Sequence, residues 1–187
     1  MKTRTFILIM SGLILSVSGK AQRNSLSAGV MVQGFSNFDP SPTYTGATLA
    51  FENKLSKHFS AQFMTGAFPK KIDDHGERTY TRHLWSFQPE FRYYPSSVFK
   101  GFFLGGNFSY HRFKTSYSFD PSLRKMPDDV FAFGFSLGVQ SAISQRIHWS
   151  LSAGGSLIPN PGAIGTGARY FFALSTGYLF REKEKKK

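Results

Sequence analysis

The 187-residue sequence contains no cysteine, and beyond Ala21 it has no apolar run of the roughly 18 residues that a membrane-spanning helix needs. Without thiols, the chain cannot form disulfides, CxxC redox centres, cysteine-rich zinc sites or thiol nucleophiles. Without long apolar runs, it is not a bundle of membrane helices. A site built from histidine or carboxylate side chains stays open.

Aromatic residues and glycine are abundant instead. The chain has 21 Phe, 8 Tyr and 18 Gly, and its aromatic content of 17% separates it from disordered proteins. Its length and its apolar content of 41% suffice for one domain with one sizeable core. So many aromatic side chains need a large, flat surface to pack against.

The first residues have the layout of a secretory signal peptide. Lys2 and Arg4 precede an uncharged apolar stretch at residues 6–15, and small residues follow up to Ala21. We therefore predict that residues 1–21 form a signal peptide cleaved after Ala21, with an uncleaved N-terminal anchor as the alternative. Because the chain is exported, its formal charge of +12 does not indicate a nucleic-acid partner.

The mature chain repeats a pattern of period two, which is typical of β-strands. Every second residue of 131–139 is Phe, Leu or Val, and the residues between them are Ala, Gly or Ser. Applied along the chain, this pattern predicts eight strands. They cover residues 25–33, 44–53, 59–68, 83–94, 102–112, 130–141, 148–157 and 167–180.

The connections between these strands alternate in length. Those at residues 54–58, 95–101 and 142–147 are short, and those at 34–43, 69–82, 113–129 and 158–166 are long. Outer-membrane barrels have short periplasmic turns and longer external loops. We therefore predict an all-β fold, an eight-stranded antiparallel up-and-down transmembrane β-barrel over residues 22–180, with both termini in the periplasm.

The distribution of lysine and of small residues favours a membrane barrel over a soluble β-fold. The lysines of the mature chain fall in predicted turns, loops and the tail, whereas a soluble surface carries many of them on its strands. The strand faces without rings are rich in Gly, Ala, Ser and Gln, which suit the narrow interior of an eight-stranded barrel. The aromatic faces then contact lipid. A soluble periplasmic binding barrel with an apolar pocket is the alternative.

Rings near the predicted strand ends form a candidate aromatic girdle, because Trp and Tyr favour membrane interfaces. Its members are Trp85, Tyr93, Trp149, Tyr170, Tyr178 and Phe180. Trp85 and Tyr170 fall near the external boundary, and the other four fall near the periplasmic one.

Four strand and turn motifs are similar to those of a known family. They lie at residues 51–56 (FENKLS), 91–94 (FRYY), 101–106 (GFFLGG) and 177–180 (GYLF). Over about residues 30–180 the chain resembles a family of small outer-membrane β-barrels, common in Bacteroidetes-type bacteria, that is classed as a domain of unknown function. The resemblance implies an outer-membrane location and supplies no catalytic residue.

Several charged residues share inward-facing parity toward the periplasmic half of their strands. They are Glu52, Glu90, Arg92 and His148. Because enclosed charges need partners, we predict a structural network of Glu and Arg in the lumen. Arg169 is also inward but nearer the outside, and we predict a separate upper cluster for it with His111, with Arg82 as a further candidate.

Two other patterns resemble functional sites and have simpler explanations. Residues 109–111 (SYH) and 148–150 (HWS) have the spacing of a Ser/His lipid hydrolase, but both pairs point into the lumen, away from lipid. The acidic segment 73–77 (DDHGE) offers ligands for a cation, but its basic flanks favour a solvated loop. Residues 181–187 form a basic tail, which we interpret as a solubilising end.

The sequence therefore predicts an integral outer-membrane barrel of structural or surface-interaction type, without catalytic activity or a cofactor. Eight strands leave an interior filled by side chains, too narrow for a general porin. The expected partners are outer-membrane lipids, lipopolysaccharide phosphates paired with basic loop residues, the barrel assembly machinery and an unidentified protein. An outer-membrane lipid-modifying enzyme is the alternative function.

Overall fold

The computed structural model describes residues 24–36, 43–74, 78–116, 129–159 and 167–180. The described elements are all β-strands. They are β1 (Asn24–Ser36), β2 (Thr43–Lys54), β3 (Phe59–Asp74), β4 (Arg78–Tyr93), β5 (Gly101–Ser116), β6 (Asp129–Ala142), β7 (Ile147–Ile158) and β8 (Gly167–Phe180). In this part of the chain no helix has the length and apolar character needed to cross a membrane.

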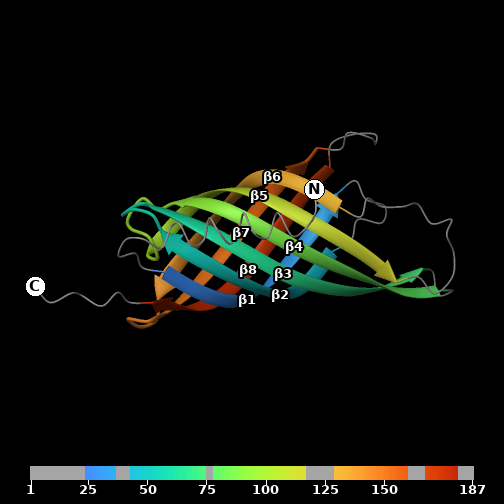
Figure 1. Ribbon diagram of the computed structural model, residues 1–187, viewed down its shortest axis with the longest axis horizontal. Helices are drawn as coiled ribbons and strands as arrows, with labels where there is room; N and C mark the ends of the chain where they lie inside the picture. Colours follow the sequence, from blue (N-terminus) through green and yellow to red (C-terminus); the bar gives the residue numbers. More distant parts are fainter. Residues whose placement is uncertain (1–23, 37–42, 75–77, 117–128, 160–166, 181–187) are drawn as a thin grey trace, which may run out of the picture.

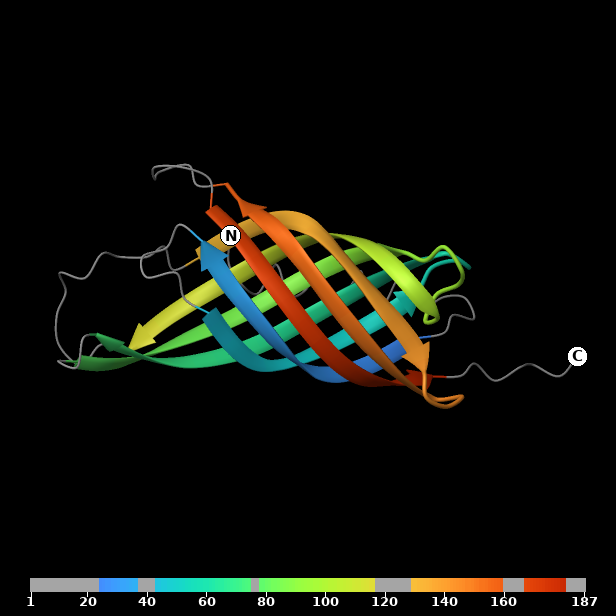
Figure 2. The same ribbon diagram turned by 180° about the vertical axis from the view of Figure 1, so that it is seen from behind.

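The strands close into a barrel in which each strand pairs antiparallel with the next and β1 pairs with β8 (Figures 1 and 2). Asn24 lies opposite Phe180 at one end. We call this the turn end, because the connections at residues 55–58, 94–100 and 143–146 lie there too, and the opposite end the loop end. The predicted eight-stranded antiparallel up-and-down fold is confirmed.

Strands near the loop end are longer than predicted. β3 continues to Asp74 and β4 begins at Arg78, where we predicted a long loop over residues 69–82. Backbone N–H and C=O groups can hydrogen-bond across a hairpin whatever the side chains are. This hairpin therefore forms without the alternation of apolar residues from which we predicted the strands. Lys70, Lys71 and Lys114 accordingly lie on strands, and Lys54 is the last residue of β2, so the prediction that the lysines avoid strands is wrong for these four.

Two turns at the turn end share one construction. The hydroxyl of Ser56 accepts hydrogen bonds from the backbone N–H groups two and three residues ahead, at 3.3 and 3.2 Å. The hydroxyl of Ser144 does the same at 3.3 and 3.1 Å. A serine in this position satisfies donors that a tight turn leaves unpaired, which explains why these connections are short.

The outer surface of the barrel is apolar. Every strand exposes at least one large hydrophobic side chain, and Phe135 on β6 reaches 79% exposure. The alternation of residues 131–139 shows in their burial, because the Phe, Leu and Val positions face outward and the small residues between them face inward.

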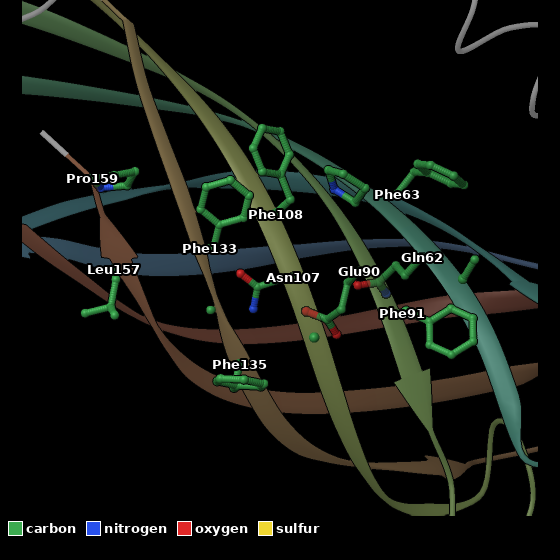
Figure 3. Close-up of a pocket in the computed structure, with 14 residues that line it drawn as sticks. Gln62, Phe63, Glu90, Phe91, Asn107, Phe108, Phe133, Phe135, Leu157 and Pro159 are labelled. Carbon is green, nitrogen blue, oxygen red and sulfur yellow. The ribbon is translucent and has the colours of Figure 1, made fainter. Parts of the chain in front are cut away.

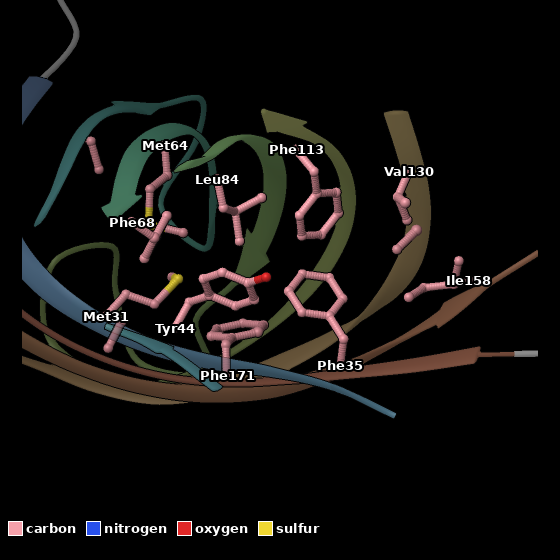
Figure 4. Close-up of a cluster of buried hydrophobic side chains, with 13 residues drawn as sticks. Met31, Phe35, Tyr44, Met64, Phe68, Leu84, Phe113, Val130, Ile158 and Phe171 are labelled. Carbon is pink, nitrogen blue, oxygen red and sulfur yellow. The ribbon is translucent and has the colours of Figure 1, made fainter. Parts of the chain in front are cut away.

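The interior holds more rings than predicted. A buried apolar cluster, the loop-end cluster, includes Phe35, Tyr44, Phe68, Phe113 and Phe171 (Figure 4). Four residues form a second one, the turn-end cluster, namely Tyr94, Val98, Phe99 and Phe103. The prediction of an interior of small side chains is therefore wrong in these two places, because some Phe side chains point into the barrel while others point outward. Polar side chains occupy much of the remaining interior.

Candidate functional site

Arg92 on β4 is the centre of an ion-pair cluster in the lumen. Its Nε donates to Glu90 Oε1 at 2.5 Å, and its Nη1 donates to Glu52 Oε2 at 3.1 Å. Its Nη2 donates to Gln62 Oε1 at 2.6 Å, and the guanidinium carbon lies 4.1 Å from the centre of the Phe103 ring. The three charged side chains are at most 4% exposed. We call these three residues the Arg92 cluster.

Strand parity and register explain why these groups meet. Positions 90 and 92 point to the same face because side-chain direction repeats every two residues along a strand. Glu90 lies opposite Gln62 on β3, and Gln62 lies opposite Glu52 on β2. The two carboxylates therefore sit at one height across three strands, and the guanidinium fork of Arg92 binds both.

Tyr94 connects this cluster with His148. Its hydroxyl donates to Glu52 Oε1 at 2.7 Å and lies 2.7 Å from Gln140 Oε1. The other end of this amide, Gln140 Nε2, lies 2.9 Å from His148 Nδ1. Burial, and after it the charge of Glu52, raises the pKa of Tyr94, which lies just beyond the end of β4. The phenol therefore remains a donor, and His148 joins the network through an amide rather than through a carboxylate.

Arg169 on β8 is a second buried guanidinium. Its Nε donates to Gln33 Oε1 at 2.8 Å, and its Nη1 donates to Gln88 Oε1 at 2.8 Å. Gln88 Nε2 donates to Glu90 Oε2 at 3.1 Å. Gln88 therefore connects Arg169 with the Arg92 cluster, and the predicted upper cluster is not separate. Its grouping of Arg169 with His111 agrees with the structure, because Arg169 Nη1 lies 3.4 Å from Ser109 Oγ, which in turn is 3.0 Å from His111 Nε2. Within the described residues, Arg169 forms no salt bridge.

Ser109 and His111 on β5 also contact each other in the lumen. His111 Nε2 lies 3.0 Å from Ser109 Oγ, and the ring centroid of Phe35 lies 5.3 Å from that of the imidazole. Both residues are fully buried. A base in contact with a hydroxyl meets one requirement of a hydrolase, but the nucleophile must also meet its substrate. In the second predicted pair, His148 contacts Gln140 and not Ser150.

The predicted girdle residues face outward. Tyr170 lies toward the loop end and four others lie toward the turn end, whereas Trp85 lies at the middle of β4, because β4 extends beyond the predicted strand. Trp149 is half-buried, and the other five are exposed. Rings also contact one another near the turn end, where the centroids of Tyr178 and Phe180 are 5.3 Å apart.

Several predicted features lie outside the described residues. They are the signal peptide at residues 1–21, the tail at 181–187 and residues 75–77 of the acidic segment. Over the part of the chain that the structure describes, no group of three His, Asp or Glu side chains is placed to hold a metal ion.

Amide side chains are the members of the network that sequence reasoning missed. Gln88 and Gln140 each link a charged or titratable side chain to another group, and Gln62 accepts a hydrogen bond from Arg92. The signal for them was present, because all three share the inward parity of their charged neighbours. Their pairings could not be predicted without the register across strands.

Comparison with protein families and solved structures gives one family and one fold. The chain matches the family described as protein of unknown function (DUF3575) over residues 9–158. Comparison with curated proteins gave no match. Neisserial surface protein A has a TM-score of 0.64 at 11% identity, with 84% of this chain and 97% of that chain covered.

Two further structures have the same fold. Ail, the attachment invasion locus protein of Yersinia pestis, has a TM-score of 0.58 at 11% identity, covering 86% of this chain and 100% of its own. The outer membrane protein OprG from Pseudomonas aeruginosa has a TM-score of 0.56 at 15% identity, covering 88% and 99%. At these identities the likeness concerns the fold.

The predicted resemblance to small outer-membrane barrels of unknown function is confirmed by the family match and by the fold of these structures. Its link to Bacteroidetes-type bacteria stays a prediction. Because the match covers most of the sequence, the chain belongs to the DUF3575 family of proteins of unknown function.

Proposed function

We propose that the protein is an integral outer-membrane barrel of structural or surface-interaction type, without catalytic activity. One observation carries this proposal: large hydrophobic side chains are exposed on every strand of a closed barrel. Soluble monomers rarely expose contiguous apolar patches larger than a few hundred Å². In a bilayer the same surface is solvated by acyl chains, and closure leaves no strand edge unpaired.

The filled interior supports a role other than that of a general pore. The loop-end cluster and the turn-end cluster fill the lumen at two levels, and the Arg92 cluster lies in the same interior. Eight-stranded barrels are just wide enough for side chains to fill them. We therefore expect no steady ion conductance.

The burial of Ser109 and His111 supports a protein without hydrolase activity. A lipid ester would have to displace the loop-end cluster to reach the serine, because Phe35 of that cluster packs on His111. His111 Nδ1 has no hydrogen-bond partner among the described residues, whereas a catalytic histidine is held by a third group. The lipid-modifying enzyme remains the alternative that the experiment below separates.

Export and partners complete the proposal. Cleavage after Ala21 delivers the chain to the barrel assembly machinery, and the apolar outer surface contacts outer-membrane lipids. Basic side chains near the loop end, such as exposed Arg112 and Lys114, pair with lipopolysaccharide phosphates. A surface-binding role has support from a structure of the same fold, since Ail was crystallised in complex with the heparin analogue sucrose octasulfate. An unidentified protein is a further partner.

Fractionation of cells that express the full chain tests the proposal. We expect the protein in the outer-membrane fraction, soluble only in detergent, and migrating faster on gels before boiling than after it. Recovery in the soluble periplasmic fraction would point to the soluble barrel instead. A change in the lipid A mass spectrum on deletion of the gene would favour the enzyme.

A further inference from the structure

A hollow of about 880 Å³ lies on the outer wall of the barrel, between β3 and β7. Figure 3 shows Phe63, Phe91 and Phe133 around it, with Glu90 and Asn107 near its centre. Those two polar side chains are buried and face the lumen, so the accessible lining is apolar like the rest of the outer surface. Lipid chains suffice to cover it, and this hollow indicates no specific ligand.

A smaller hollow at the turn end has a different lining. Its volume is about 380 Å³, and it lies between the connection at residues 94–100, the turn at 143–146 and the end of β8. We call it the turn-end groove. The turn-end cluster forms its apolar part, and no acidic side chain is among the described residues that line it. Its polar groups include three hydroxyls and one ammonium, those of Ser97, Ser141, Ser144 and Lys100.

The turn end carries positive charge without exposed negative charge to balance it among the described residues. Each of its three connections holds an exposed cation, namely Lys57, Lys100 and Arg146. The described carboxylates nearest to this end, those of Glu52 and Glu90, are buried within the Arg92 cluster. In the same part of the chain, Lys100 and Arg146 form no salt bridge. An anionic ligand at this end is therefore attracted and not repelled by the described side chains.

Contacts with the outer surface place the groove at the level of the girdle. Phe180 lines it and faces outward, and Ser141 lies opposite Trp149 in the register. Arg146 Nη1 donates to the Tyr178 hydroxyl at 3.2 Å, so this cation lies beside an outward-facing ring. Trp and Tyr in girdles lie at the level of lipid headgroups. On the proposed function and the predicted orientation, the groove therefore meets the headgroups of the inner leaflet.

The polar groups of the groove can donate hydrogen bonds to a ligand. Within the part of the chain that the structure describes, the hydroxyls of Ser97 and Ser141 and the ammonium of Lys100 form no hydrogen bond. The Ser144 hydroxyl accepts from two backbone N–H groups, which leaves its own proton to donate. Phosphate oxygens are acceptors, and hydrogen bonds between charged groups are stronger than neutral ones. The lining therefore favours a phosphate.

We propose that the turn-end groove binds the phosphate of an anionic phospholipid from the inner leaflet, with Lys100 and Arg146 as its cations and the serine hydroxyls as further donors. The acyl chains of this lipid lie along the girdle beside Phe180. A zwitterionic lipid fits less well, because its ammonium group would lie near two cations and no exposed carboxylate. This inference rests on the proposed membrane location and adds a ligand at the periplasmic end.

Lys100→Gln and Lys54→Gln provide a matched pair of test variants. Each removes one positive charge at the turn end and keeps a long polar side chain. Lys100 lines the groove, whereas Lys54 is the last residue of β2, on the opposite side of the closed barrel from β6. A general attraction between the turn end and anionic lipid is weakened equally by both changes, and binding in the groove is weakened by Lys100→Gln.

The experiment uses the mature chain with Trp85→Phe, folded into phosphatidylcholine vesicles, so that Trp149 beside the groove is its one tryptophan. The probe is phosphatidylglycerol brominated near the headgroup end of its acyl chains, which quenches the fluorescence of a tryptophan that it contacts. Brominated phosphatidylcholine and phosphatidylethanolamine are the comparisons. Gel migration before boiling verifies the folding of each variant.

The expected preference follows from the two cations. Each cation near an anionic lipid contributes about fivefold in affinity, so we expect about a 25-fold preference for phosphatidylglycerol over phosphatidylcholine at low salt. Lys100→Gln lowers the preference to about fivefold, the further change Arg146→Gln abolishes it, and Lys54→Gln leaves it near the starting value. Brominated diacylglycerol lacks the phosphate, and we expect Ser97→Ala to lower the preference for phosphatidylglycerol over it about fivefold, the equivalent of one net hydrogen bond.

Other results overturn the inference. Equal quenching by phosphatidylglycerol and phosphatidylcholine, or equal losses for Lys100→Gln and Lys54→Gln, means that the groove holds no lipid of its own. Phosphatidylethanolamine as effective as phosphatidylglycerol contradicts the argument from charge. If inorganic phosphate reverses the quenching more than sodium chloride at the same ionic strength, the groove binds a soluble phosphate instead. Failure of the chain to insert into vesicles rejects the proposed function, whereas insertion without a lipid preference rejects the groove alone.

Discussion

Replacement of Arg92 by methionine is the sharpest test of how the lumen is held together. Methionine keeps much of the aliphatic volume but leaves Glu52 and Glu90 without their shared cation, in a site where both carboxylates are 1% exposed. Removing one partner from a buried ion pair costs about 3–5 kcal/mol, because an uncompensated charge stays behind. We expect Arg92→Met to lower the free energy of unfolding by this amount.

The carboxylates supply the second half of the test. If the loss comes from stranded charge, Glu52→Gln and Glu90→Gln in the Arg92→Met background remove that charge, and most of the stability returns. Neutral replacements of whole buried ion clusters often have little effect, so we expect the triple variant within about 1–2 kcal/mol of the wild type. Each Glu→Gln change made alone should cost about 1–3 kcal/mol, since the glutamine oxygen still accepts a hydrogen bond from Arg92.

Urea unfolding in lipid vesicles, followed by gel migration before boiling, measures these free energies. Arg112→Met is the control, because Arg112 and Asp129 form an exposed pair at 3.9 Å that should contribute about 0–1 kcal/mol. Additive losses in the triple variant would show that the three side chains do not act as one cluster. A loss for Arg92→Met no larger than that of the control would refute the reasoning about burial.

Four further outcomes are expected. The processed chain begins at Gln22, which N-terminal sequencing checks; an intact Met1 would mean an uncleaved anchor. Cysteine in place of Lys114 reacts with an impermeant maleimide on intact cells and cysteine in place of Ser144 does not, and the reverse result would invert the barrel. Phe99→Gly weakens the turn-end cluster and raises the ion conductance of planar bilayers, whereas unchanged conductance would mean that the loop-end cluster alone closes the lumen. Pro89→Val restores a backbone donor where Gln88 and Pro89 have no paired partners on β5, so we expect it to raise the free energy of unfolding by about 1 kcal/mol; a destabilised variant would show that the interrupted pairing has another cause.

The meeting of Glu90, Arg92 and Glu52 could be predicted because strand parity and strand height suffice to place residues that far apart. The link from Arg169 to Glu90 could not be predicted, since it depends on which amide rotamer of Gln88 lies between them. Local alternation carries information about a strand's own two faces, and none about amide pairings across the lumen.

The turn-end cluster escaped prediction for a different reason. Val98 and Phe99 lie in a connection, where no period of two indicates which way a side chain points. Phe99 is buried with a φ of 66°, a left-handed conformation that is uncommon for a bulky side chain. Its contact with the His148 ring, at 6.1 Å between centroids, and its burial in the cluster offset that cost. Tertiary packing, rather than local preference, places this residue.

The stability of the barrel does not explain why the pairing of β4 with β5 is interrupted at Gln88 and Pro89. The register is the same on both sides of this interruption, so the proline does not sit at a bulge, and a closed barrel has no edge strand on which to place it. Almost any other residue would supply the missing donor, and a barrel built for stability alone would use it. Local rules that a fold breaks without compensation tend to mark functional sites. The interrupted pairing at Gln88 and Pro89 is therefore the place where the barrel wall departs from a design for stability alone.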